Sequence, residues 1–146
     1  MQHFIAFDHV DTRVRSLRAV EAFYDRLMPE LGLPLKRYAF VDERGDWHDA
    51  RADGSYNTVE YHEAQVPDRA DFFIGFIDDP AHEPSMTRIA FRVSRERLDE
   101  IGAFLGPIGA RAVERSESMD EYPAIFFEDP AGTKLEICAR PLRAGT

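Results

Sequence analysis

The sequence lacks several features that would reveal its environment or chemistry directly. Its 146 residues include one cysteine, Cys138, so no disulfide can form within the chain. No apolar run approaches the ~20 residues that a membrane-spanning helix needs, so we expect no membrane partner. The first residues carry no basic segment ahead of an apolar one, and we expect no signal peptide. Since a chain with little cysteine is typical of a reducing compartment, we predict a cytoplasmic protein.

Positive charge is also scarce. The chain has 18 lysines and arginines against 27 aspartates and glutamates, a net charge of −9 at pH 7 with neutral histidines. Such a chain repels a phosphate backbone, so we expect no nucleic-acid partner. There is no phosphate-binding Walker loop and no Gly-x-Ser-x-Gly motif, and the glycines at 102, 106 and 109 end a predicted helix instead of opening one. The sequence therefore gives no sign of a nucleotide-binding P-loop, of the nucleophile turn of an α/β-hydrolase or of a dinucleotide-binding glycine motif.

The chain does contain an internal repeat. A strand-like run over residues 7–15 leads into a helix-like stretch that ends near Gly32, with Ser16 as its N-cap. About eighty positions later, residues 87–94 lead into a second helix-like stretch that ends near Gly106. Both helices are followed by short apolar strands. A repeat that occurs only twice predicts two paired modules and not a solenoid.

Each module is predicted to have the order βαβββ. The first module covers residues 1–77, a linker with two prolines covers 78–85, and the second module covers 86–146. We interpret the polar, glycine-interrupted stretch 43–55 as a loop. The predicted strands are those at residues 4–14, 34–42, 56–63, 71–77, 86–93, 110–117, 122–128 and 133–139.

This order, together with three stretches of sequence, resembles the vicinal oxygen chelate superfamily, also called the glyoxalase/bleomycin-resistance/dioxygenase group. The stretches are FDHVDTRVRSLRAVEAFYDRLMPELGL at the start, RIAFRVS in the middle and FFEDPAGTKLEIC at the end. The resemblance implies an α+β fold in which two βαβββ modules form a curved, cup-like mixed sheet. It also implies a divalent metal on the floor of the cup in many members, and a homodimer.

Aligning the two halves under this resemblance places His9, Phe73, Arg88 and Glu136 at four symmetry-related positions on the floor. Members that use a metal carry His or Glu there. His9 and Glu136 fit that pattern, whereas the guanidinium of Arg88 has no lone pair to donate and Phe73 offers no ligand atom. We therefore predict no metal site and no cofactor.

One alternative concerns the register of the first module. If strand 56–63 were its last strand, Glu60 would occupy the second carboxylate position, and His9, Glu60 and Glu136 would form most of a divalent-metal site. We favour strand 71–77 as the last one, because it directly precedes the linker just as its repeat partner directly precedes the C-terminus.

The predicted catalytic residues are Glu136, as a general base, and His9. Arg88 suits a carboxylate or phosphate group because its planar fork pairs with two oxygens at once. An ion pair between Arg88 and Glu136 is the alternative interpretation, because two opposite charges in a partly buried cleft need partners. Cys138 is interpreted as a small buried apolar residue. The predicted ligand-binding residues are Arg88, Phe73, Tyr122 and Trp47.

The favoured function is a metal-free cup that binds or transforms a small polar or aromatic molecule. One alternative is a divalent-metal-dependent lyase of the glyoxalase type, or an extradiol-type dioxygenase, that uses His9 and Glu136. Another is a non-catalytic, partner-binding protein whose cup is plugged by its own salt bridges. The absence of a histidine at position 88 ranks the metal-free cup above the metal-dependent enzyme.

Overall fold

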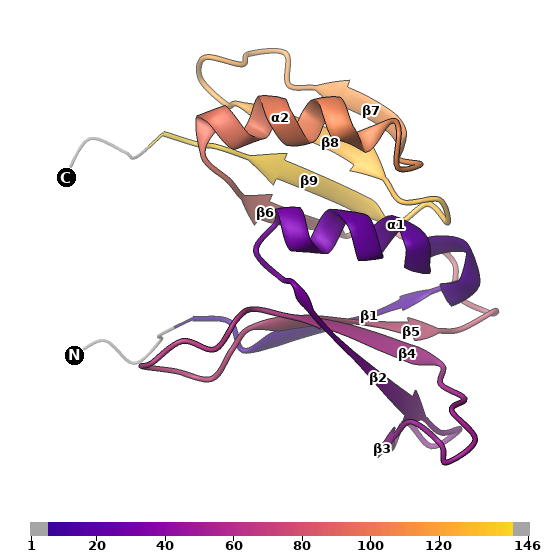
Figure 1. Cartoon of the computed structure of the whole chain (residues 1–146). Coiled ribbons are helices and arrows are strands. Elements are labelled where there is room, and N and C mark those ends of the chain that lie inside the picture. Colours follow the sequence, from indigo (N-terminus) through magenta and orange to yellow (C-terminus); the bar gives the residue numbers. More distant parts are fainter. Residues whose placement is uncertain (1–5, 142–146) are drawn as a thin grey trace. The chain divides into compact units, whose positions relative to one another are not determined.

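The computed structural model describes residues 6–141, which fold as two compact units divided between His82 and Glu83 (Figure 1). The boundary between the units lies in the segment 78–85. Each unit holds one helix and one mixed sheet, and together the described residues form two helices and nine strands. No helix in the described part of the chain has the length and apolar character needed to cross a membrane.

The first unit has a five-stranded sheet in the order β1-β5-β4-β2-β3. Strands β1 and β5 are parallel, and the other neighbours are antiparallel. Its elements along the chain are β1 (His9–Val14), α1 (Leu17–Glu30), β2 (Leu35–Val41), β3 (Trp47–Asp49), β4 (Thr58–His62) and β5 (Phe73–Asp78).

The second unit repeats this arrangement in a four-stranded sheet of order β6-β9-β8-β7. Strand β9 pairs in parallel with β6 as β5 does with β1. The predicted pair of βαβββ modules is thus confirmed, with one further strand, β3, in the first module, and so is the choice of strand 71–77 over 56–63 as the last strand of that module. The elements are β6 (Arg88–Arg92), α2 (Arg95–Leu105), β7 (Arg111–Arg115), β8 (Ala124–Glu128) and β9 (Lys134–Cys138).

Both helices begin where the sequence predicts. The Ser16 hydroxyl accepts a hydrogen bond from the Ala19 backbone N–H, and Ser94 does the same for Arg97. Helix α1 ends at Glu30, one residue after a proline in its last turn. Its apolar face is fully buried, and so is the shorter apolar face of α2. The buried helix residues are Leu17, Val20, Phe23, Tyr24, Leu27, Met28, Leu98, Ile101 and Leu105.

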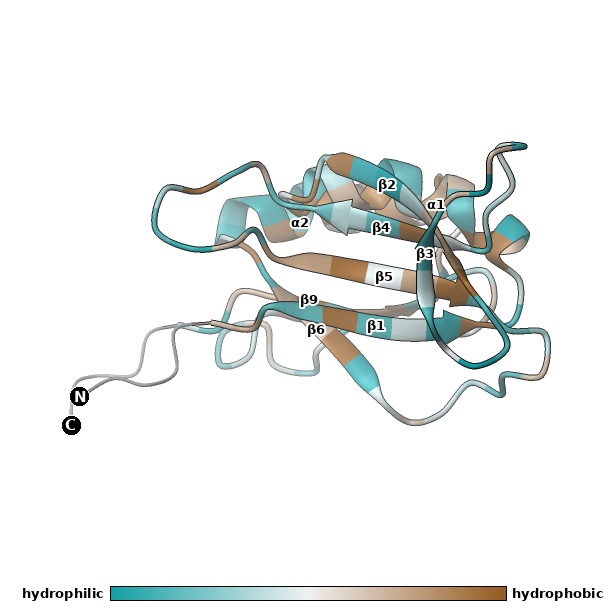
Figure 2. Cartoon of the chain, turned by 90° about the horizontal axis from the view of Figure 1, so that it is seen from below, coloured by the Kyte–Doolittle hydropathy of each residue, from teal (hydrophilic) through white to brown (hydrophobic). Residues whose placement is uncertain are grey.

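Hydrophilic and hydrophobic residues alternate along β1 (Figure 2). In β1, His9 and Asp11 are exposed while Val14 is buried. In β9, Leu135 and Ile137 belong to the core under α2. In β1, the exposed and buried faces are therefore the predicted ones.

The interpretation of residues 43–55 as a loop is wrong at its centre, because Trp47–Asp49 forms strand β3 against β2. The side chain of Asp42 organises this hairpin: its Oδ1 accepts hydrogen bonds from the Arg44 and Asp46 backbone, and its Oδ2 lies 2.7 Å from Nε2 of His48. The polar composition of this segment predicts a loop, but the hydrogen bonds of Asp42 in the turn stabilise a short edge strand there.

The strand predicted over residues 4–14 begins at His9 in the described part of the chain, and residues 1–5 lie outside it. The reason is the partner strand: His9 is the first residue of β1 paired with β5, opposite Phe73. Phe7 precedes the strand and is 73% exposed.

Strand β7 contains a bulge. Arg111 lies opposite Glu128 and Glu114 lies opposite Phe126, so three steps on β7 match two steps on β8. Ala112, inside the bulge, has a φ of 50°, in the left-handed region that favours glycine. The extra residue turns the Glu114 side chain to the same face of the sheet as Phe126.

Candidate functional site

Three aromatic rings form a row on the open face of the first unit. His9, Phe73 and His62 are cross-strand partners on β1, β5 and β4. The His9 and Phe73 ring centroids are 4.6 Å apart at an angle of 4°, and those of His62 and Phe73 are 4.5 Å apart at 19°. The predicted site residues His9 and Phe73 are therefore in direct contact, and His62 completes the row.

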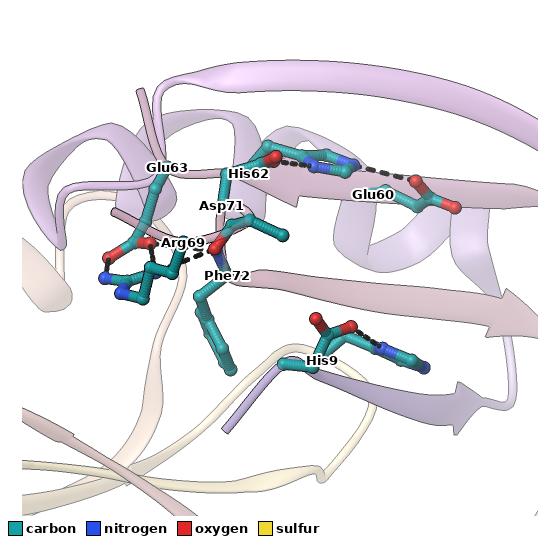
Figure 3. A network of polar contacts seen from close by, with 9 residues as sticks. His9, Glu60, His62, Glu63, Arg69, Asp71 and Phe72 are labelled. Atoms are coloured by element: carbon teal, nitrogen blue, oxygen red, sulfur yellow. Dashed lines mark hydrogen bonds and ion pairs between the residues drawn. The ribbon is translucent and has the colours of Figure 1, made fainter. Parts of the chain in front are cut away.

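His62 is fixed between two carboxylates (Figure 3). Its Nδ1 lies 2.5 Å from Oδ2 of Asp71, and its Nε2 lies 2.8 Å from Oε1 of Glu60. The His62 side chain is only 6% exposed. The hydrogen bond from His62 lowers the pKa of Asp71. Both ring nitrogens of His62 therefore already have a carboxylate partner within the first unit.

His9 is the more accessible of the two histidines. Its Nδ1 lies 2.6 Å from Oδ2 of Asp8, its Nε2 lies 3.5 Å from Oδ2 of Asp11, and its side chain is 43% exposed. The hydrogen bond with Asp8 raises the pKa of His9, and the negative charges of Asp11 and Glu60 act in the same direction against partial burial. This environment favours the protonated ring, which competes with metal binding.

A second row on the same face is built around Gly75, whose cross-strand partners are Asp11 and Glu60. A Cβ at Gly75 would lie 2.9 Å from Oδ1 of Asp11, 3.5 Å from Cη2 of Trp47 and 3.8 Å from Cγ of Glu60. Trp47 thus reaches from β3 across the sheet to this glycine. Burial raises the pKa of Asp11, and the charge of Glu60 adds to that rise.

The strand register corrects one equivalence. Because Gly75 pairs with Asp11 as Glu136 pairs with Ala90, the residue equivalent to Glu136 is Gly75 and not Phe73. Sequence alternation gives the face of a residue but not its position along the strand, so an error of two residues leaves the pattern unchanged. The position that would supply a second carboxylate therefore has no side chain.

The segment between β4 and β5 is closed by a second set of polar contacts (Figure 3). Arg69 donates from both terminal nitrogens to the two oxygens of Glu63, at 2.7 and 3.1 Å. Glu63 also accepts a hydrogen bond from the Phe72 backbone at 2.8 Å. These contacts position Asp71 beside His62, so the segment supports the row of rings without contributing to it.

In the second unit, Glu136 occupies the centre of the open face. It is 5% exposed, and its Oε1 accepts a hydrogen bond of 2.6 Å from the hydroxyl of Tyr122. That bond is the main cause that raises the pKa of Tyr122 to about 12. Tyr122 is therefore a protonated donor at neutral pH, and it orients the carboxylate of Glu136. Cys138, on the same face, is buried as expected.

Arg88 does not pair with Glu136 among the described residues; its Cζ instead lies 4.7 Å from the centroid of the Phe126 ring. The register explains this, because Arg88 lies opposite Lys134 while Glu136 lies opposite Ala90. The ordinary reading of Arg88 and Glu136 as an ion pair is thus wrong, and Glu136 takes Tyr122 as its partner.

A pocket of about 380 Å³ adjoins the guanidinium of Arg88 and the ring of Phe126. Arg115 contributes to the wall, but its guanidinium donates to Asp99 at 3.2 Å. The lining residues are Arg88, Glu114, Arg115, Ser116, Glu117 and Phe126. The pocket therefore presents one aromatic-stacked cation together with two exposed carboxylates.

The donor set does not fit the divalent metal that the resemblance implies. Within residues 6–141, no three side chains of His, Cys, Asp or Glu are placed to hold one ion. Arg88 stands where a histidine is expected and has no lone pair. The two potential ligands, His9 and Glu136, belong to different units and are each hydrogen-bonded within their own unit.

Comparison with solved structures supports the fold. A glyoxalase/bleomycin resistance protein from Albidiferax ferrireducens has a TM-score of 0.61 at 20% identity, over 92% of this chain and 98% of that one. A mutant of the fosfomycin resistance protein FosX from Listeria monocytogenes, complexed with Mn(II) and dihydroxypropylphosphonic acid, has a TM-score of 0.63 at 19% identity, over 95% and 93%. This chain has the glyoxalase/bleomycin-resistance fold.

The glyoxalase/bleomycin-resistance fold also occurs in a possible glyoxalase from Bacillus cereus, with a TM-score of 0.60 at 15% identity over 93% of this chain and all of that one (100%). No family model matches the sequence. No curated protein matches it either. The likeness therefore establishes the fold, and the chemistry must come from the side chains that the fold carries.

Two residues at the candidate sites of this glyoxalase/bleomycin-resistance fold, His62 and Glu114, are not among the predicted site residues. The sequence contains an indication for His62, because it lies two positions after Glu60 in a predicted strand and so shares its face. The sequence contains no such indication for Glu114. A regular β7 would place Val113 opposite Phe126, and only the bulge brings Glu114 there. The six predicted residues form two groups: His9, Phe73 and Trp47 in the first unit, and Arg88, Tyr122 and Glu136 in the second.

Proposed function

We propose that this chain binds a small anionic molecule without a resident metal ion and holds the anionic group on Arg88. The observation that carries this proposal is the placement of the guanidinium over Phe126 at the pocket. Stacking on a ring holds the planar group in one orientation and leaves its N–H edge free to pair with two oxygens of a carboxylate or phosphonate.

The proposal includes a catalytic role for Glu136, supported by Tyr122. Glu136 is the general base, and the Tyr122 hydroxyl fixes its orientation through the 2.6 Å hydrogen bond. In this proposal His9 acts as a cationic ring at the edge of the first unit, and Phe73 and Trp47 provide apolar contact surface. The proposal also includes a cytoplasmic location, as predicted from the sequence, and a homodimer, as the resemblance implies.

The solved relatives support an anionic ligand. FosX from Listeria monocytogenes is described in complex with Mn(II) and either a phosphonic acid or a sulfate ion. The same complexes favour a second candidate, a divalent-metal-dependent lyase that uses His9 and Glu136. The two candidates differ in one requirement, since only the second loses its ligand affinity when metal is removed.

The test is a thermal-shift and calorimetric titration of metal-analysed protein with phenylphosphonate and benzoate, and with uncharged benzamide as the control ligand. We expect both anions to bind after chelation, and Arg88→Ala to weaken them at least tenfold. Arg18→Ala, which removes an exposed arginine from α1, is the matched control and leaves binding unchanged.

Loss of anion binding on chelation, together with a stoichiometric metal that disappears in His9→Ala, would establish the second candidate and refute the first. Unchanged affinity in Arg88→Ala would refute the assigned role of Arg88.

A further inference from the structure

The pocket beside Arg88 carries opposite charges on separate elements. Arg88 comes from β6, while Glu114 comes from the end of β7 and Glu117 from the turn that follows it. All three line the same pocket of about 380 Å³. Arg115, the other cation of the lining, is occupied by Asp99. The charges left to meet a ligand are therefore one positive group and two negative ones.

The side chain of Glu114 lines this pocket because of the bulge in β7, whose backbone is strained at Ala112. Without the bulge, Val113 would lie opposite Phe126 and Glu114 would face the helix side of the sheet. The bulge keeps Ala112 at a φ of 50°, where a residue with a Cβ is strained. Bulges commonly redirect a side chain next to a binding site. Here the redirected side chain is a carboxylate, placed on the same face as Arg88 and Phe126.

We propose that the pocket selects a zwitterion, with the anionic group of the ligand on Arg88 and a protonated amine between Glu114 and Glu117. This inference rests on the proposed function, because the anion is held by the same Arg88. It adds that the amine contributes to affinity. A simple anion meets two like-charged carboxylates in this pocket, whereas an aminoalkyl anion satisfies them.

The experiment compares three probes by calorimetry at neutral pH and low salt: a series of aminoalkylphosphonates with spacers of increasing length, the corresponding alkylphosphonates, and the corresponding alkylamines. We expect at least one aminoalkylphosphonate to bind roughly threefold to tenfold more tightly than its alkylphosphonate, which is within the combined contribution of two exposed charge pairs. The preference should fall as salt is added.

The double variant Glu114→Gln/Glu117→Gln removes both carboxylates and keeps their shape. It should bind alkylphosphonate at least as tightly as the unmodified protein does and lose the preference for the amine. Glu121→Gln removes an exposed carboxylate of the same unit outside the pocket lining, and should keep that preference. The unfolding midpoints of the variants check that each is folded.

The outcomes separate the two proposals. Alkylphosphonate binding without an amine preference, or an amine preference that survives in the double variant, overturns the zwitterion inference and leaves the anion site intact. Absence of phosphonate binding that depends on Arg88 overturns the proposed function and this inference together.

Discussion

Replacing Tyr122 by phenylalanine tests whether its hydroxyl supports the buried carboxylate of Glu136. The rise of the Tyr122 pKa from 10.0 to about 12 would correspond to roughly 2.7 kcal/mol in a fully shielded site. The ring is 36% exposed, so solvent screening reduces that value, and we expect a loss of about 1 kcal/mol at neutral pH. For a chain of this size, this is a fall in melting temperature of roughly 3 °C.

The pH dependence of this loss has a definite sign. The folded pKa of Tyr122 lies above the unfolded value, so the hydrogen bond contributes fully below about pH 10 and its contribution disappears as the pH rises towards about 12. The difference in unfolding free energy between the parent protein and Tyr122→Phe should therefore shrink across that window. Urea unfolding followed by far-ultraviolet circular dichroism, at neutral pH and near pH 11, measures it.

Tyr38→Phe is the matched control for Tyr122→Phe. Tyr38 is 46% exposed and is held by ring contact with Tyr56. We expect its replacement to change the unfolding free energy by less than about 0.5 kcal/mol. Equal urea midpoints for the parent protein and Tyr122→Phe, or a difference between them that grows above pH 10, would refute the assigned coupling.

Three further changes probe other parts of the structure. Ala112→Gly should raise the unfolding free energy by about 1 kcal/mol in urea, because it relieves the left-handed backbone of the β7 bulge; no gain would mean that the bulge is unstrained. His62→Ala should cost about 3 kcal/mol in the same assay, since it removes a buried ring between two carboxylates. Because the hydrogen bond from His62 lowers the pKa of Asp71, that pairing contributes above the ordinary carboxyl pKa and is lost on acidification, which unfolding curves from neutral to acidic pH resolve. Ser94→Ala should lower the melting temperature by an amount equivalent to about 1 kcal/mol, because α2 loses its N-cap, and an unchanged melting temperature would contradict that role.

The sequence was sufficient for the parts of the fold that depend on periodicity. Alternation in β1 and β9 and helical spacing after Ser16 and Ser94 predict the elements, because one face of each must be buried. These signals are local and recur in both modules. The repeat therefore predicted the order of the elements, whereas the mixed sheets were expected from the resemblance.

The contacts that build the sites follow from features that periodicity does not encode. Sequence alternation equates Glu136 with Phe73, two residues from Gly75, because a shift of two residues keeps every side chain on the same face. The hairpin at Trp47 depends on hydrogen bonds to Asp42, and the orientation of Glu114 depends on one extra residue in β7. Each is a local departure from regular structure, and such departures tend to occur at functional sites.

The duplicated scaffold carries different chemistry in its two copies. In the first unit, the row that corresponds to Glu136 is Asp11, Gly75 and Glu60, two carboxylates around a missing side chain. In the second unit, the same row is Ala90, Glu136 and Phe126, one carboxylate that is held by a tyrosine hydroxyl.

The first strands of the two units differ in the same way, because His9 begins β1 between Asp8 and Asp11 whereas Arg88 begins β6 over an aromatic ring. A metal ion held between two similar modules needs lone-pair donors from both of them. In this chain, Arg88 stands at one position where the resemblance implies a donor, and Gly75 stands at another. In the proposed function, the permanent cation of Arg88 meets a ligand that brings its own negative charge, so anion binding by Arg88 is the property to measure before any reaction is sought.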